Sequence, residues 1–275
     1  MGNALFCYPD RLLGSATYPS VLSGGAWRSS FPLVNLKDRL LSKVTRSTNA
    51  LTTSTNWDTD LGTPRNLRLF ALLNSNLSPA ATVRRRIYTD SGYTQLVHDT
   101  GALPVPWAAL DAETLTGWRP DFWHALAADQ TGRYVRTEVV DPANPAGYVE
   151  IGRALMMSAW QPQLNIAMSP TIQYDHSDTT IDRIPGGPSY ATRRSPRRVE
   201  NIALSGLAPT EAHQAVLEMQ RILGRDGELF FVYDPTETDF YARQKSFLCT
   251  MREATPLEYP YYDRYTVGLT LEEVL

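Results

Sequence analysis

The stretch Trp57–Asp90, WDTDLGTPRNLRLFALLNSNLSPAATVRRRIYTD, has the pattern of two β-strands joined by a polar turn. Alternate residues of a strand share one face, and the apolar ones here are Leu67, Leu69, Ala71 and Leu73. Asn74-Ser75-Asn76 is the predicted turn, because Asn and Ser hydrogen-bond locally and Asn tolerates left-handed backbone. The second strand is expected over 82–88. The pair is typical of a β-sandwich.

Length and composition indicate a globular protein that can fold without disulfide cross-links. The chain has 275 residues, of which 43% are hydrophobic and 20% charged, with a formal net charge of −3. This length suffices for one large or two modest domains with real cores. The charge is not that of a nucleic-acid binder, so no nucleic-acid partner is expected. Scattered Pro and Gly between strand-like runs predict a mainly β protein.

The two cysteines, Cys7 and Cys249, lie near opposite ends of the sequence. A bridge between them is one interpretation and two free thiols are the other, which we favour; a disulfide framework is excluded by the count. The N-terminal residues lack the basic and apolar regions of a secretory signal. No apolar run reaches the roughly 18 residues of a membrane span. We therefore expect a soluble product made in a reducing compartment, without membrane insertion.

Aromatic residues divide the chain into two predicted cores. All six tryptophans lie within the first 160 residues, whereas tyrosines dominate the last third. We predict an N-terminal lead over 1–50 that partly packs on the C-terminal domain, and a sandwich over 51–160 with strands near 51–57, 65–73, 80–88, 132–139 and 147–157. An extended connection or arm is predicted over 161–198, and a strand–helix–strands domain over 199–275.

Two segments have more specific predictions. Residues 104–128 are rich in tryptophan, including Trp107, Trp118 and Trp123, and are expected to form a partly helical insertion. Its aromatics can form a satellite core, which we favour because large aromatics are mostly buried, or a contact surface. In the last domain, an apolar stripe at helical spacing predicts a helix that begins near Thr210, a candidate cap, and ends at Gly224.

No catalytic signature is present, so the chain is not expected to be an enzyme or to hold a cofactor or metal. There is no Gly-rich phosphate loop, GxSxG, HExxH or CxxC. Asp175-His176-Ser177-Asp178 is the strongest candidate for a cation site or a base. However, neighbouring side chains of an extended segment point in opposite directions, and a polar loop explains the same residues.

Arginines form two short runs. Arg193, Arg194, Arg197 and Arg198 can clamp phosphate or carboxylate groups, contact another subunit, which we favour, or lie solvated. In the other run, Arg84 and Arg86 are expected to face solvent or a partner. Arg85 shares the apolar side of its strand with Val83 and Ile87, so it needs a buried acidic partner or a position at a sheet edge.

A family resemblance rests on the order of several short motifs. They are Trp57–Gly62, Ala71–Ser78, Ala81–Arg84, Asp141–Asn144 and the run Gly147–Arg153, GYVEIGR. Together they resemble the galactose-binding-like (discoidin-type) jelly-roll domain in tail-tip proteins of long-tailed bacteriophages and gene transfer agents. The C-terminal part is similar to phage distal-tail or minor-tail proteins, so that the resemblance spans about 51–275. It implies a mainly β fold with a jelly-roll sandwich and a small C-terminal α+β or barrel-like domain.

The resemblance supports two hypotheses from different classes. The first is a structural virion protein, a distal-tail or baseplate adaptor that forms a ring with copies of itself and joins the tail tube to hub or fibre proteins. It would be made in the host cytoplasm and reside in the phage tail. The second is a carbohydrate-binding module for host glycans, with candidate contacts at Asn74, Asn76, Trp107, Trp118 and Trp123. A third, a cell-wall polysaccharide hydrolase, would need a carboxylate pair, and no spacing singles one out.

Overall fold

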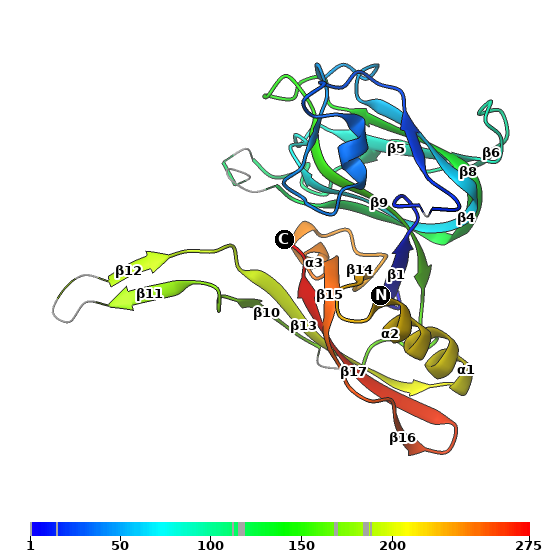
Figure 1. Cartoon of the computed structure of the whole chain (residues 1–275), viewed down its shortest axis with the longest axis vertical. Helices are drawn as coiled ribbons and strands as arrows, with labels where there is room; N and C mark the ends of the chain where they lie inside the picture. Colours follow the sequence, from blue (N-terminus) through cyan, green and yellow to red (C-terminus); the bar gives the residue numbers. More distant parts are fainter. Residues whose placement is uncertain are drawn as a thin grey trace. The chain divides into compact units, whose positions relative to one another are not determined.

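The computed structural model describes residues 2–14, 16–111, 113–114, 119–167, 170–183, 187 and 189–275. The chain folds into two compact units. The first contains Met1–Phe6, Trp160–Glu237 and Arg243–Leu275, and the second contains Cys7–Ala159 and Thr238–Ala242. The fold is mainly β, as the sequence predicts: a β-sandwich in the second unit, and a smaller α+β arrangement with one helix in the first (Figure 1).

The sandwich is built on an antiparallel sheet in the order β9-β4-β8-β5-β6. Its short strands β2, β3 and β7 pair with β4, β9 and β5 respectively. The bounds of these strands are β2 Val21–Ser23, β3 Thr45–Arg46, β4 Asn56–Ser75, β5 Thr82–Tyr88, β6 Leu96–Asp99, β7 Leu103–Pro104, β8 Phe122–Val140 and β9 Glu150–Trp160.

Strands β4 and β8 are much longer than predicted. The predicted strand over 65–73 and the end of the one predicted over 51–57 belong to the single strand β4, which begins at Asn56 and pairs with β8 along most of its length. Residues 51–55 form a turn before it. The register of this pair shifts between Asp60 and Arg65 and between Leu67 and Leu69. Such shifts bend a strand, so β4 pairs with β2 over its first part and with β9 over its second.

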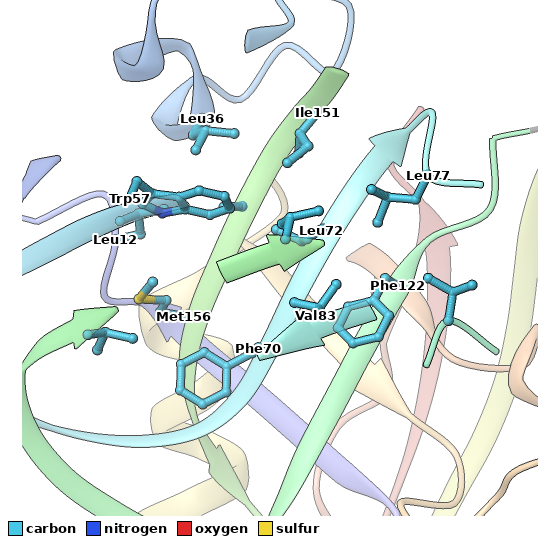
Figure 2. Packing of buried hydrophobic residues seen from close by; sticks show 14 of the residues in the cluster. Leu12, Leu36, Trp57, Phe70, Leu72, Leu77, Val83, Phe122, Ile151 and Met156 are labelled. Atoms are coloured by element: carbon cyan, nitrogen blue, oxygen red, sulfur yellow. The ribbon is translucent and has the colours of Figure 1, made fainter. Parts of the chain in front are cut away.

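The core of the sandwich contains the inward residues of this sheet. Phe70, Leu72, Val83 and Phe122 gather in one apolar layer, and Trp57 lies beside Leu12 and Leu36 (Figure 2). Burying a side chain of this size contributes about 1.5–3 kcal/mol. The sequence predicted Leu67, Leu69, Ala71 and Leu73 on one face of the strand, but Phe70 and Leu72 enter this core with Leu67, whereas Leu69, Ala71 and Leu73 are buried outside it. The register shift between Leu67 and Leu69 accounts for the change of face.

The segment before β4 belongs mostly to the sandwich. We predicted that residues 1–50 partly pack on the C-terminal domain; Met1–Phe6 group with that unit, and the segment from Cys7 onwards groups with the sandwich. Strand β1 spans Leu5–Asp10 and the short 3-10 helix η1 spans Leu33–Lys37. Leu12 and Leu36 are fully buried in the sandwich core, so apolar burial assigns this segment to the second unit.

The tryptophan-rich segment differs from the predicted helical insertion. Strand β8 begins at Phe122, and Phe122 and Trp123 pair with Leu72 and Ala71 of β4. Residues 122–128 therefore belong to β8 and not to a helix, because β8 offers the backbone of β4 a long partner, a pairing that local sequence does not reveal.

The first unit contains a sheet in the order β10-β13-β17-β15-β14, with β16 paired to β17. A helical run extends from Pro209 to Leu223 as α1, a π-helical segment η2, and α2. A short helix, α3, follows later, and its residues 240–242 group with the sandwich unit. The bounds are β10 Thr171–Asp175, β13 Arg197–Leu207, α1 Pro209–Glu211, η2 Ala212–Leu217, α2 Glu218–Leu223, β14 Glu228–Val232, α3 Phe240–Arg243, β15 Phe247–Ala254, β16 Glu258–Tyr261 and β17 Arg264–Glu273.

The helical run matches the predicted apolar stripe. Ala212, Val216, Met219 and Leu223 are buried, whereas Ile222 of the same predicted stripe is exposed. The helix ends at Gly224, whose φ is 54°. A positive φ at the end of a helix is a conformation that glycine adopts most readily. The N-terminal end differs from expectation: the N-cap is Ala208, without a side-chain hydrogen bond, and Pro209 occupies the first turn.

The predicted arm over 161–198 contains strands. Its β10 pairs with β13, and a separate hairpin is formed by β11, Thr180–Arg183, and β12, Ser189–Thr192 (Figure 1). The side chains of Ile181 and Tyr190 on this hairpin are exposed.

Candidate functional site

A polar and aromatic cluster forms where β3 meets the start of β9. Arg46 and Glu150 are directly opposite each other in the antiparallel register. Arg46 donates a hydrogen bond from Nε to Glu150 Oε2 over 2.7 Å, and its Nη2 lies 2.5 Å from the same oxygen. This two-nitrogen contact fixes the orientation of both side chains. We call the group around it the Arg46 cluster; its members are Arg28, Phe31, Arg46, Arg119, Tyr148 and Glu150.

Two half-buried aromatic rings enclose the guanidinium of Arg46. Its central carbon lies 4.4 Å from the ring centroid of Phe31 and 4.5 Å from that of Tyr148. Arg28, which is exposed, lies 5.4 Å from the same Tyr148 ring. A planar guanidinium stacks on aromatic faces while its N–H groups remain directed outward at the edge. The cluster therefore combines apolar faces with oriented donors.

Glu150 is the acidic centre of the cluster. Its side chain is only 5% exposed, and its second oxygen accepts a hydrogen bond from Arg119 Nη1 at 2.6 Å. Burial alone would raise the pKa of Glu150, but the hydrogen bonds from Arg119 and Arg46 outweigh it and hold the pKa below its ordinary value. Three arginines and one glutamate give the cluster a charge of 3 − 1 = +2.

The predicted contact residues Asn74 and Asn76 are both engaged in hydrogen bonds within the chain, and those of Asn76 are to two members of this cluster. Asn76 donates from Nδ2 to the Tyr148 carbonyl at 3.1 Å and accepts from the Glu150 N–H at 2.7 Å. Asn74, with a φ of 50°, donates to the Leu41 carbonyl at 2.9 Å. Asn76 thus positions the Arg46 cluster, and both amides bond the backbone.

The tryptophans predicted as possible sugar contacts, Trp107 and Trp123, are buried in the protein. Trp107 is fully buried, donates from Nε1 to the Leu77 carbonyl at 3.1 Å and packs on Phe240. Trp123 is also buried, on the face of β8 opposite to Phe122. Neither ring presents a face to a sugar, because both fill the interior of the protein. Trp118 lies outside the described residues.

The four arginines of 193–198 divide into two pairs. Arg193 and Arg194 are exposed, and the role of a subunit contact remains a prediction for them. Arg197 forms ion pairs with Asp178 and Glu272. Arg198 is buried, pairs with Glu273 and stacks over Phe247. Arg197 and Arg198 therefore hold strands of the first unit together.

No metal-binding or membrane-spanning arrangement is found in the described parts of the chain. Within them, no three His, Cys, Asp or Glu side chains are grouped so that they could hold a metal ion. In the candidate 175–178 loop, Asp175 accepts from the Ser177 N–H and contacts Arg252. No helix in the same ranges has the length and apolar character needed to cross a bilayer. Both cysteines are free, buried thiols.

Sequence reasoning missed most of the Arg46 cluster. Tyr148 and Glu150 belong to the GYVEIGR motif, but nothing local connects them to Arg46, which lies 104 residues before Glu150. The pairing of β3 with β9 creates that proximity. Phe31 and Arg28 join the cluster through separate backbone hydrogen bonds: the Arg46 N–H donates to the Phe31 carbonyl, and the Arg28 N–H donates to the Arg46 carbonyl.

Comparisons with known proteins give structural similarities only. No protein-family model matches the sequence, and no curated protein matches it. A mutant lectin-binding domain of lectinolysin complexed with Lewis b is 14% identical, over 55% of this chain and 97% of that chain, with a TM-score of 0.38. The family 32 carbohydrate-binding module of Clostridium perfringens NanJ, complexed with galactose, is 10% identical over 56% and 99%, with a TM-score of 0.39. A Streptococcus pneumoniae fucose-binding module is 11% identical over 54% and 95%, with a TM-score of 0.37.

Proposed function

We propose that the β-sandwich is a carbohydrate-binding module and that glycans bind at the Arg46 cluster. The observation that carries the proposal is the half-buried pair Phe31 and Tyr148 around the Arg46 guanidinium, with Glu150 at its edge. Ligand sites combine apolar faces with a few oriented polar groups. Aromatic rings suit the apolar face of a sugar ring, and charged planar groups suit its hydroxyls.

The charge of the cluster favours an acidic glycan. Glu150 is already satisfied by two arginines, whereas Arg28 and Arg119 remain accessible; the side chain of Arg119 is 45% exposed. Guanidinium groups bind carboxylates with two parallel hydrogen bonds. We therefore expect sugars that carry a carboxylate or sulfate to bind more tightly than their neutral counterparts.

A glycan array with the purified chain, followed by calorimetry on the best ligand, tests this proposal. Tyr148→Ala should weaken binding at least tenfold, and Arg119→Ala should weaken the acidic ligand selectively. Arg221→Ala is the matched control, because Arg221 is an exposed arginine paired with a glutamate in the helix of the other unit. Binding that is absent from the array, or unchanged in Tyr148→Ala, would exclude the Arg46 cluster as a glycan site.

A second candidate is the distal-tail or baseplate adaptor of a phage virion, assembled in the host cytoplasm from copies of this chain and joined to tube, hub or fibre proteins. The exposed apolar residues of the first unit support it. Ile172 and Tyr174 lie exposed on β10, which ends the strand order of its sheet, and Ile181 and Tyr190 lie exposed on the hairpin. Unpaired strand edges pair readily with another chain.

Light scattering after size exclusion tests the adaptor role. We expect a closed ring, or assembly on mixing with a tail protein, and we expect removal of 176–196 to abolish it. A chain that stays monomeric in both conditions would eliminate this second candidate and leave the glycan-binding proposal in place. The two functions are compatible, since they use different units of the chain.

A further inference from the structure

Arg85 is a buried cation without an acidic partner in the part of the chain that the structure describes. It lies on β5 between Val83 and Ile87, on the core side of the sandwich, and is 2% exposed. Its sequence context predicts a buried acidic partner or an edge position. Instead, β5 lies between β8 and β6, and Arg85 forms no ion pair with any described residue. The residues outside the described ranges include no Asp or Glu.

The surroundings of the guanidinium are aromatic. Its central carbon lies 4.9 Å from the ring centroid of Phe70 and 5.9 Å from that of Phe122, two residues that project into the apolar layer around Val83 (Figure 2). Ring faces attract a cation but accept no conventional hydrogen bond. Burial lowers the pKa of Arg85 to about 9, so the group is still charged at neutral pH.

Arg85 is one end of a row of unsatisfied polar groups. Thr137 of β8 pairs with Arg85 on one side and with Trp57 of β4 on the other, in direct antiparallel register. Arg85 Nε, Thr137 Oγ1 and Trp57 Nε1 are each buried without a hydrogen-bond partner among the described residues. Directly opposed residues lie about 5 Å apart at Cβ and face the same side of a sheet. The row therefore lines one strip of the core.

The polar groups of this row can all donate hydrogen bonds, and no acceptor among the described residues pairs with them. Arginine and tryptophan nitrogens are donors only, and threonine can donate. A buried donor left unsatisfied costs about 1–3 kcal/mol, and more if it is charged. What would complete this strip is an acceptor that also carries a negative charge. A water molecule supplies the acceptor but leaves the positive charge uncompensated.

We propose that a halide-sized monovalent anion binds in the core of the sandwich beside Arg85, in contact with the Thr137 and Trp57 donors. Its small size follows from the enclosure, because all three residues are at most 2% exposed. The anion neutralises the guanidinium charge and accepts hydrogen bonds from the N–H and O–H groups that have no partner among the described residues. This inner site is distinct from the Arg46 cluster and does not depend on its glycan-binding role.

Crystals of the intact chain grown in bromide test the proposal directly. We expect an anomalous diffraction peak within about 3.5 Å of Arg85 Nε. In parallel, thermal unfolding is measured in chloride and in gluconate at equal ionic strength, which separates binding from screening. Chloride at ten times its dissociation constant should raise Tm by about 3–5 °C over gluconate.

Two variants and a control complete the test. Arg85→Met should remove the chloride effect, and Thr137→Val should reduce it. Arg84→Met, its neighbour on β5 paired with Asp99, should retain it. If Arg85→Met does not fold, the bromide peak in the unaltered chain decides. Absence of a peak beside Arg85, or a chloride effect that persists in Arg85→Met, would overturn the inference.

Discussion

Arg46 and Glu150 face each other across the β3–β9 pair, joined by a 2.7 Å hydrogen bond between Nε and Oε2. Most of the Glu150 side chain is withdrawn from water. The pair therefore differs from a surface ion pair, which contributes little. A charge buried in this way is stabilised only while its partners remain, and this dependence has consequences for stability, for pH and for ligand binding.

Replacing Glu150 by Gln is expected to destabilise the sandwich. The amide retains the shape but leaves Arg46 and Arg119 without their counter-charge, at a cost of about 1–3 kcal/mol in the free energy of unfolding. Urea denaturation followed by circular dichroism measures it. Asp38→Asn is the control, because Asp38 pairs with an exposed lysine, Lys43, and should change nothing measurable. A Glu150→Gln chain as stable as the parent would contradict a structural role for the pair.

The same carboxylate is expected to make stability fall in acid. The pKa of Glu150 in the folded protein lies below its ordinary value of 4.5. A depressed carboxylate pKa stabilises the folded state above the unfolded pKa, and this contribution is lost as the pH falls through the folded pKa. The difference in unfolding free energy between the parent and Glu150→Gln should therefore be full at pH 7 and shrink below about pH 4.5. A difference independent of pH would show that the charge is not its cause.

Glu200 is expected to make stability fall as the pH rises, the opposite of the effect of Glu150. It is buried on β13, its Oε2 has no hydrogen-bond partner in the described structure, and burial raises its pKa to about 8 despite Lys245 and Arg198 nearby. A raised carboxylate pKa means that the folded state holds the proton more tightly, so stability falls as the pH rises from 4.5 towards 8, by up to about 1.4 kcal/mol per pH unit. Unfolding titrations between pH 4.5 and 8.5 measure this slope.

The control for Glu200 is Glu200→Gln, an uncharged side chain of the same shape. Asp10, whose pKa burial raises to about 6, contributes a slope of the same sign to both proteins. Subtracting the unfolding free energies of the two proteins at each pH therefore isolates the contribution of Glu200. Parallel titrations would mean that Glu200 is charged in the folded protein at neutral pH.

Gly152 is expected to tolerate no side chain. A Cβ atom there would lie 2.5 Å from the Leu41 carbonyl oxygen and 3.2 Å from that of Leu73, and both contacts are backbone. Gly152→Ala should lower the free energy of unfolding by about 1–3 kcal/mol, measured by thermal and urea denaturation. Gly268→Ala is the matched strand control, because its Cβ would meet only the Thr255 side chain. Equal losses in the two variants would show that close backbone approach is not the reason.

Elements with local causes were predictable from the sequence. The helix that ends at Gly224 follows from an apolar stripe and a terminal glycine, and the inward alternation of β5 follows from a two-residue period. The extent of β8 was not predictable, because Phe122 and Trp123 become strand residues only by pairing with β4. The residues of 104–128 alone could not reveal that their partner strand lies some 50 residues earlier in the sequence.

Sequence by itself determined which residues of β5 turn inward: Arg85 had to lie on the apolar side of its strand, with Val83 and Ile87. Tertiary structure alone decided what surrounds them. It placed Phe70 and Phe122, and no carboxylate of a described residue, against Arg85, and it joined Arg46 to Glu150 across 104 residues. The physical reason is that periodicity arises from the local backbone, whereas charge compensation depends on which distant strands pair.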